Sequence, residues 1–342
     1  MTPFLSVPQT HSNGKANLLA LALFIFGMVA TTLGITVGVN GLDNLVDLSN
    51  DPTALQIIWD IRLPRTLGAL MAGALLGLSG SLAQGLFRNP LADPYLLGSA
   101  SGASLGVALA LVLCAASPIA PPWIISLGLT GAAFVGAMGA VFLTLLLAKG
   151  AQQTLRLLLG GVIVGVVLGA LCSVIMLMDP HVMQIMQTFM LGSISLVGWS
   201  SVKLMSLVWI ICMVVSWSLS RVLDALSLGE ATARSLGLRL NQMRSILIAV
   251  LALAIGGAVA QTGLIAFVGL ASPHLVRSVV RVKHSQLLFL SSLTGAVLLL
   301  SADLGARWLI APQELPVGVL TAVLGGGYLL WLMHNQNVGP RN

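Results

Sequence analysis

Residues 66–87 read TLGALMAGALLGLSGSLAQGLF and carry no charged side chain, with Arg65 before them and Arg88 after them. A helix of about 20 apolar residues is long enough to cross the hydrocarbon core of a bilayer. An ionised group at the bilayer centre is costly, so flanking arginines mark the points where such a helix leaves the lipid. The segment is therefore predicted to be a membrane-spanning helix.

The composition of the whole chain agrees with this prediction. Of its 342 residues, 57% are apolar and 8% are charged, whereas about 25% of the residues in a soluble domain are charged. This composition excludes a soluble globular protein. The cysteines lie in apolar runs without CxxC spacing, so neither a disulfide framework nor a thiolate metal site is expected. They are Cys114, Cys172 and Cys212.

Uncharged runs along the chain predict an all-α polytopic membrane protein with ten transmembrane helices. The spans are placed within 16–42 and 66–87, in two parts of 94–148 divided at Pro118, Pro121 and Pro122, at 157–178, in a run ending near Ser220, in two parts of 245–276, at about 285–302 and at 315–333. The first span lacks a cleavage site and is interpreted as a retained anchor. Residues 16–334 are predicted to form one membrane domain, with tails at 1–15 and 335–342.

Two segments do not fit a simple span. Residues 180–202 are uncharged but contain His181 and several amide and hydroxyl side chains, so an interfacial or re-entrant helix is expected. Residues 263–277 are short for a span, and Pro273 is expected to break them. Irregular backbone at membrane depth requires protein or a water-filled cavity beside it.

The basic residues predict the orientation of the chain. With a cytoplasmic N-terminus, twelve of the sixteen lysines and arginines fall on the inner side. The positive-inside rule favours this arrangement. The four outer ones are Arg62, Arg65, Lys203 and Arg307. The net charge of +6 is thus explained by membrane insertion, and no nucleic-acid partner is expected.

Many of the 37 glycines recur at four-residue spacing. The rows are Gly73 and Gly77; Gly98, Gly102 and Gly106; and Gly161, Gly165 and Gly169. Such rows let helix backbones approach closely. They are either packing faces within one bundle or surfaces on which helices slide during a transport cycle.

No charged residue lies in the middle of any predicted span, although ion-coupled transporters commonly carry one there. The pair Gly14-Lys15 does not match a phosphate-binding loop, so a partner is expected to supply nucleotide chemistry. Residues 77–80 match the GxSG pattern of an intramembrane serine protease, whose serine needs a histidine base within hydrogen-bond reach. Every histidine of this chain lies at or outside the end of a predicted span. Ser79 is therefore assigned to packing. We expect no catalytic residue, metal ligand or cofactor. A secondary transporter or channel working alone is the alternative class.

Three arginines are candidates for an outer binding surface. Pro64 suits the first turn of a helix and would hold Arg62 and Arg65 at the membrane surface, while Arg307 precedes the last span. They either extend to lipid phosphates or pair with carboxylates on a docking protein.

Two inner loops are the other candidate sites. Asn89 and Asp93 each precede a proline, so residues 88–94 form a stiff loop that is either a gate lining or a plain turn. Residues 226–238 predict one or two short helices ending at Gly237, with Glu230 and Arg234 at a favourable spacing. A small apolar face there fits either a groove on another protein or the membrane surface. That face consists of Ala231, Ala233 and Leu236.

Four blocks carry a resemblance to a known family. They are RLPRTLGALMAGALLGLSGSLAQGLFRNPLADPYLLGSASGASLG (62–106), LSLGEATARSLGL (226–238), GLIAFVGLASPHLVR (263–277) and ELPVGVLTAVLGG (314–326). In this order and spacing they resemble FecCD-type permease subunits of the ABC importers for iron(III)-siderophores, haem and cobalamin. The resemblance covers about residues 16–334. The chain departs from it at residues 325–327, which are Gly-Gly-Gly where Gly-Ala-Pro is common.

The resemblance implies a type II ABC importer permease fold in a bacterial inner membrane, with both termini cytoplasmic. It implies a second permease subunit, as a homodimer with a heterodimer left open, two cytoplasmic ABC ATPase subunits and a periplasmic substrate-binding protein. The implied cargo is an iron(III)-siderophore, with haem, cobalamin and molybdate as alternatives.

The resemblance also assigns roles to particular residues. Arg62, Arg65 and Arg307 match arginines that meet glutamates on the binding protein. Asn89, Leu91 and Thr154 match positions at the cytoplasmic gate. The residues matched to the ATPase-coupling helices are Leu228, Gly229, Glu230, Ala231, Arg234, Leu236 and Gly237.

Overall fold

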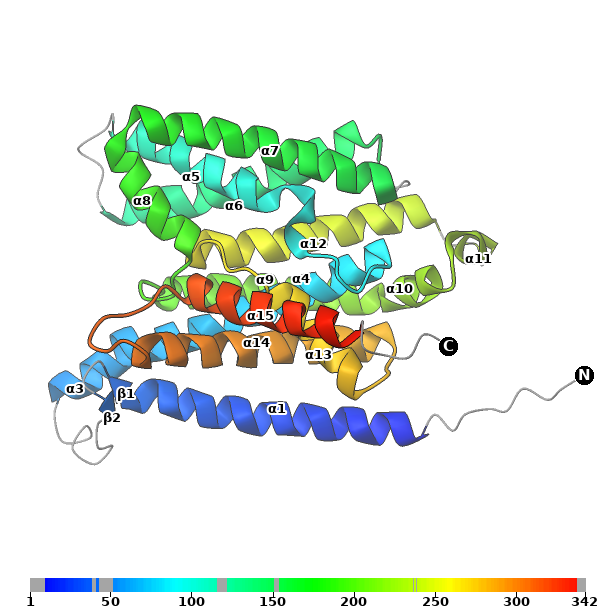
Figure 1. Cartoon of the computed structure of the whole chain (residues 1–342), viewed down its shortest axis with the longest axis horizontal. Helices are drawn as coiled ribbons and strands as arrows, with labels where there is room; N and C mark the ends of the chain where they lie inside the picture. The colour runs from blue at the N-terminus through cyan, green and yellow to red at the C-terminus, as the bar shows by residue number, and fades with distance from the viewer. Residues whose placement is uncertain are drawn as a thin grey trace, which may run out of the picture.

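The uncharged segment that begins after Arg65 forms the helix α4 (Leu63–Phe87), which is buried along most of its length. The computed structural model describes residues 10–38, 41–42, 52–115, 122–150, 154–235, 237 and 239–336. These residues form a bundle of roughly aligned helices (Figure 1). Beside α4, the long helices are α1 (Thr10–Thr36), α5 (Ser99–Ala115), α6 (Pro122–Leu147), α7 (Thr154–Met178), α9 (Trp199–Ser218), α12 (Leu240–Thr262), α14 (His284–Trp308) and α15 (Val317–Gln336).

Shorter elements connect the long helices. They are α3 (Pro52–Ile57), a π-helical turn η1 (Ile58–Arg62), a 3-10 turn η2 (Pro94–Leu97), α8 (Pro180–Leu191), α10 (Ser220–Ser227), α11 (Glu230–Ser235) and α13 (Val268–Val279). Two-residue strands β1 (Val37–Gly38) and β2 (Gly41–Leu42) pair antiparallel just after α1.

The all-helical membrane fold is confirmed. Among the described residues, seven helices are long and apolar enough to cross a membrane, and the apolar segments Ser99–Leu113 and Val317–Trp331 are shorter. The count of ten spans stays a prediction. Pro122 begins α6, as the division of the run 94–148 requires, while Pro118 and Pro121 lie outside the described residues.

The segment 180–202 forms a shorter helix than expected. The helix α8 covers only residues 180–191, Gly192 follows it at a φ of +68°, and the last residues of the segment already belong to α9. Asp179 caps α8 by accepting hydrogen bonds from the backbone nitrogens of His181 (2.9 Å) and Val182 (3.4 Å). Whether α8 is re-entrant or interfacial stays a prediction.

The predicted break at Pro273 is wrong, because α13 continues through this proline. The irregular backbone lies earlier, at residues 263–267, between positive φ angles at Gly263 (+69°) and Phe267 (+68°). Protein groups satisfy it: the Leu264 nitrogen donates to the Phe189 carbonyl at 3.1 Å. Non-helical backbone at membrane depth is tolerated where protein supplies such partners.

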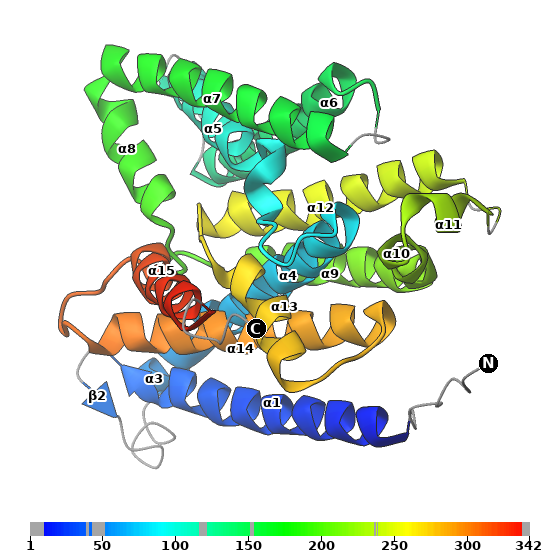
Figure 2. The ribbon, with the colours of Figure 1, turned by 45° about the vertical axis from the view of Figure 1, so that its right-hand side comes forward.

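The helix α4 lies at the centre of one half of the bundle, in contact with α9, α12, α13 and most extensively α14 (Figures 1 and 2). The helices α5, α6 and α7 pack together as a second group, which α12 joins to the first through α6. The first turn of α1 and the last turn of α15 lie toward the same end of the bundle.

Glycines explain how α4 approaches its neighbours so closely. A Cβ atom at Gly77 would lie 2.1 Å from the Ser291 carbonyl oxygen, and one at Gly73 would lie 2.2 Å from the Gly295 carbonyl oxygen. Gly102 meets the carbonyl oxygen of Gly136 on α6 in the same way, at 2.3 Å. These contacts support the packing interpretation of the first two glycine rows. In the third row, on α7, only Gly161 is packed as tightly, since a Cβ there would lie 2.0 Å from the Leu96 carbonyl oxygen.

Replacing Gly80 with alanine is expected to destabilise the protein by about 2 to 3 kcal/mol or more, because overpacking strains a core that cannot shift. The new Cβ would lie 1.7 Å from the backbone oxygen of Gly269. Thermal unfolding in detergent measures the effect. Gly139→Ala is the control, since nothing lies within 4 Å of a Cβ there and alanine favours helix. Equal melting temperatures for the two variants would contradict the packing account.

Candidate functional site

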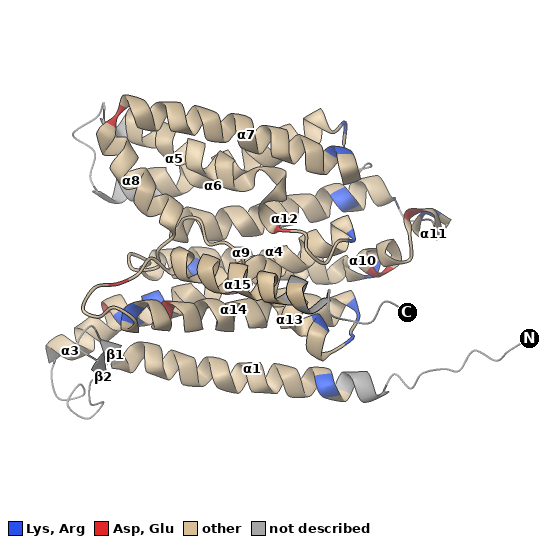
Figure 3. Ribbon diagram, in the orientation of Figure 1, with Lys and Arg blue, Asp and Glu red and all other residues tan. Residues whose placement is uncertain are grey.

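Charged residues lie mostly near the ends of the helices, as the colours in Figure 3 show. One group lies where α4 begins and α14 ends, and another lies around α10 and α11. We call Arg65, Asp303, Arg307 and Glu314 the outer charge cluster, since Arg65 and Arg307 are predicted from the sequence to lie on the outer side.

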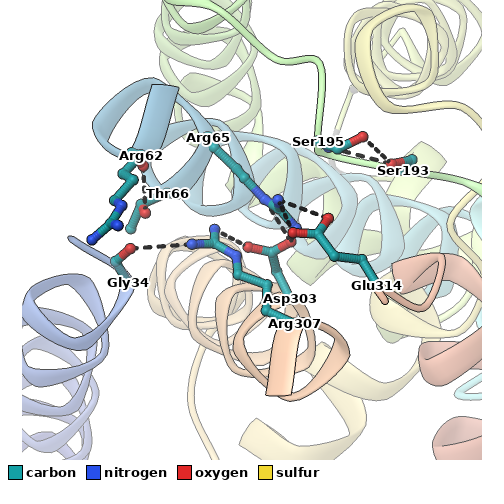
Figure 4. Close-up of polar contacts among 9 residues, drawn as sticks. All are labelled: Gly34, Arg62, Arg65, Thr66, Ser193, Ser195, Asp303, Arg307 and Glu314. Carbon is teal, nitrogen blue, oxygen red and sulfur yellow. Dashed lines mark hydrogen bonds and ion pairs between the residues drawn. The ribbon is translucent and has the colours of Figure 1, made fainter. Parts of the chain in front are cut away.

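The centre of the outer charge cluster is the Asp303 carboxylate, whose side chain is 1% exposed. Its Oδ1 accepts hydrogen bonds from Arg65 Nη2 at 3.0 Å and Nε at 3.3 Å, and its Oδ2 accepts one from Arg307 Nη2 (Figure 4). Arg65 Nη1 also donates to both oxygens of Glu314, at 2.8 and 2.9 Å. One guanidinium thus holds two carboxylates that lie 238 and 249 residues further along the chain.

The cluster ties several elements together at this end of the bundle. Asp303 and Arg307 are one turn apart on α14, and Arg65 is in the first turn of α4. Arg307 Nη1 donates to the Gly34 carbonyl at 3.1 Å, and Arg62 Nη1 donates to the Ile35 carbonyl at 3.2 Å. The end of α1 is therefore held against both α4 and α14.

The three arginines lie at one end of the bundle, as expected from the sequence, but their environments differ. Arg307 is buried, the Arg65 side chain is 11% exposed, and Arg62 is partly exposed. Sequence reasoning missed the internal carboxylates, although the four-residue spacing of Asp303 and Arg307 was a visible signal for that pair. It also ended the predicted span at residue 302, whereas α14 extends to Trp308. The role of the arginines in docking stays a prediction.

The predicted stiff loop after α4 is present. Arg88 ends α4 in the left-handed conformation, and Asn89 Oδ1 accepts a hydrogen bond from the Leu91 nitrogen at 3.0 Å. Asp93 is extended, as expected before a proline, and caps η2. The Leu91 side chain is exposed, and Thr154 is the first residue of α7. A gate role for Asn89, Leu91 and Thr154 stays a prediction.

The inner loop folds into two short helices, α10 and α11. Gly229, at a φ of +108°, separates them, and Gly237, at +76°, follows the second. Leu228 projects between them with a 68% exposed side chain, and Ala231 is exposed. Leu236 lies outside the described residues. We call the described residues of 220–237 the coupling segment, because they include the described residues that the resemblance assigns to the coupling helices.

The expectation that Ala233 faces a partner is wrong, because its side chain is fully buried within this chain. It packs in a small core with Leu226 of α10 and Leu240 of α12. The short α11 must bury one face against its own chain to be stable, and the sequence alone did not show which face that is.

A buried arginine fixes α11 in place. Glu230 accepts a hydrogen bond from Arg244 Nη2 at 2.5 Å, whereas Arg234 Nη2, the partner expected from the spacing, lies 3.8 Å away. The Arg244 guanidinium lowers the pKa of the Glu230 carboxyl below its ordinary value of 4.5. The sequence did not predict Arg244 as the partner, because helical spacing pairs residues three or four apart. Arg244 lies 14 residues after Glu230, on α12.

Acidification is expected to loosen α11. A carboxyl whose pKa is lower in the folded state stabilises the fold above its unfolded-state pKa and loses that contribution as the pH falls through the folded value. Hydrogen exchange in α11, corrected for intrinsic rates, should therefore accelerate below about pH 4.5. Glu230→Gln should exchange faster already at neutral pH, and Arg234→Gln should resemble the wild type. Exchange in the wild type that does not change with pH would contradict this.

The coupling segment is joined to α14 by a further pair. Asp224 Oδ1 of α10 accepts a hydrogen bond from the His284 nitrogen at 3.0 Å and lies 2.8 Å from His284 Nδ1. His284 is the first residue of α14, and Asp303 and Arg307 are near its other end. A single helix thus connects the coupling segment with the outer charge cluster.

Comparison with known proteins agrees with this geometry. A family model described as the FecCD transport family matches residues 18–335. The chain belongs to the FecCD transport family. The matched range agrees with the extent of the resemblance found in the sequence blocks.

Several FecCD relatives and related structures are similar over most of the chain. The hemin transport system permease protein HmuU of Yersinia pestis is 39% identical, over 83% of this chain and 85% of the relative. The vitamin B12 import system permease protein BtuC of Escherichia coli O157:H7 is 40% identical, over 82% and 85%. A structure described as an inward-facing metal-chelate type ABC transporter has a TM-score of 0.83 at 29% identity and covers 93% of this chain and 99% of its own. PsaBC of Streptococcus pneumoniae, at 17% identity and a TM-score of 0.58, shows a similar fold alone.

Proposed function

We propose that this chain is the membrane-spanning permease subunit of an ATP-driven type II importer of metal chelates. The observation that carries the proposal is the family match together with α14, which links the outer charge cluster near its last turn to the coupling segment at its first residue. Such a link is what a subunit needs if energy and substrate arrive from partners on opposite sides of the membrane. The chain's lack of charge at mid-span supports an external energy source.

The proposed cargo is a metal chelate, with an iron(III)-siderophore as the first candidate. Haem and cobalamin are the alternatives that the names of HmuU and BtuC support, and molybdate is a fourth. The neighbour with the TM-score of 0.83 is itself described as a metal-chelate type transporter.

The proposed assembly contains two permeases, two cytoplasmic ATPases and one periplasmic binding protein in the bacterial inner membrane. A loaded binding protein docks at the end of the bundle that holds Arg62, Arg65 and Arg307. ATP binding to the partners moves α10 and α11, which changes the side on which the pathway between the permeases opens, past Asn89, Leu91 and Thr154. Each ligand shifts the populations of two states by binding them unequally.

Purification of the complete assembly tests this proposal. The binding protein of the same transport system, isolated from cells without added ligand, is expected to retain a metal chelate that mass spectrometry and elemental analysis identify. The permease is expected to co-purify with an ABC ATPase. A retained sugar, amino acid or peptide would contradict the chelate assignment, and a permease active without any ATPase would contradict the importer class.

A further inference from the structure

Arg65 holds two carboxylates that differ in their exposure to solvent. Asp303 is 1% exposed and is shared with Arg307, whereas Glu314 is 32% exposed and is held by Arg65 alone among the ion pairs described. The Glu314 contact is short and involves both carboxylate oxygens, at 2.8 and 2.9 Å. The two carboxylates therefore bind the same guanidinium but have different access to the outside.

The strengths of the two contacts should differ accordingly. Removing one partner of a buried pair leaves an uncompensated charge and is strongly destabilising. An exposed ion pair contributes little, since water and ions compete for both groups. Asp303 is thus a fixed partner of Arg65, and Glu314 is an exchangeable one.

We propose that Glu314 is an internal competitor for docking: it occupies the edge of Arg65 that a carboxylate of the binding protein takes when it docks. This inference rests on the proposed function. The incoming carboxylate replaces Glu314 at Arg65 Nη1, and Asp303 keeps its bonds to Nη2 and Nε. The charge of the buried part of the cluster is unchanged, so the α4–α14 contact persists through the exchange.

The exchange also changes how the segment that carries Glu314 is held to the rest of the protein. Glu314 lies in the short segment between α14 and α15, where the Leu315 nitrogen donates to the Ala306 carbonyl at 3.1 Å. Four residues after Glu314, the Gly318 nitrogen on α15 donates to the Gly192 carbonyl at 3.3 Å. Release of the Glu314 carboxylate breaks the ion pair between Arg65 and this segment. The backbone hydrogen bonds of Leu315 and Gly318 still hold the segment in place.

The test measures binding of the ligand-loaded binding protein to the complete transporter in lipid nanodiscs. The binding protein comes from the same transport system and carries the ligand that it retains on purification. Glu314→Gln removes the competing charge and is expected to tighten docking by about threefold to tenfold, mainly through slower dissociation. The increase should persist at high salt, where long-range effects of one removed charge are screened.

Asp179→Asn is the matched control. It makes the same charge change near the start of α8, which lies at the same end of the bundle as the cluster, and asparagine caps a helix as well as aspartate does. Its effect on docking is expected to be under twofold and to vanish at high salt. Docking that is unchanged or weaker in Glu314→Gln, with normal binding by the wild type, would overturn this inference alone. A wild-type transporter that does not bind the protein at all would overturn the proposed function with it.

Discussion

Replacing Asp303 with asparagine is expected to lower the melting temperature of the permease strongly and to reduce the fraction that stays monodisperse after extraction. Asp303 is the carboxylate shared by Arg65 and Arg307, and all three side chains are largely buried. Loss of this charge is expected to cost about 3 to 5 kcal/mol, because Arg307 then has no carboxylate partner among the ion pairs described and Arg65 keeps only Glu314. That is a large fraction of the stability of a typical protein.

The measurement is thermal unfolding of the purified permease, together with the fraction that is monodisperse after extraction. Ser301→Ala is the control on the same helix, since the Ser301 hydroxyl bonds only to the Val297 carbonyl of its own helix among the hydrogen bonds described. It should melt within a few degrees of the wild type. A variant Asp303→Asn that is as stable as Ser301→Ala would show that the cluster does not hold the helix ends together. Arg307→Glu would likewise leave buried charges without partners. A loss of docking in that variant therefore reports on docking only if the variant is shown to be folded.

Leu228→Asp is expected to abolish binding of the ATPase subunits while leaving the permease folded. The Leu228 side chain is 68% exposed between α10 and α11, so a charge there disturbs little within the chain. If the coupling segment enters a groove on the ATPase, a buried aspartate without a partner lowers the affinity by about 2 kcal/mol or more, or about thirtyfold. ATP-dependent uptake should then fall to background.

Co-purification of the ATPase with tagged permease measures this effect. Leu196→Asp is the matched control, because Leu196 is 94% exposed and lies between α8 and α9, near the end of the bundle opposite the coupling segment. It is expected to retain the ATPase. Equal retention by the two variants would place the ATPase contact elsewhere.

The uncharged runs predicted most of the long helices because a bilayer permits few alternatives to a helix. The close contacts of the glycine rows in 73–77 and 98–106 agree with the packing interpretation, but their partners on α14 and α6 follow from the tertiary fold. The break at 263–267 escaped detection because it depends on positive φ angles and on hydrogen bonds from distant segments. Pro273 was the more visible signal and lies inside a helix.

The sequence identified residues of the candidate sites but not the residues with which they form ion pairs. Arg65 and Glu230 were both singled out, yet the partners that define their chemistry, Asp303 and Arg244, lie far along the chain or beyond the local helical repeat. Of residues 325–327, only Gly326 and Gly327 depart from the family pattern, and nothing in their surroundings explains glycine there. Gly325, which the pattern shares, is required by close packing. A Cβ at Gly325 would lie 2.3 Å from the Phe267 Cβ, in the irregular segment before α13. The helix α15 continues through all three glycines.

The most direct test of the proposed function is uptake of the metal chelate into vesicles. Wild-type permease would be reconstituted with its ATPase inside, ATP inside, and loaded binding protein outside. Accumulation is expected only when the ATPase, ATP and the binding protein are all present. Uptake by the permease alone, or uptake driven by an ion gradient without ATP, would contradict the proposed function.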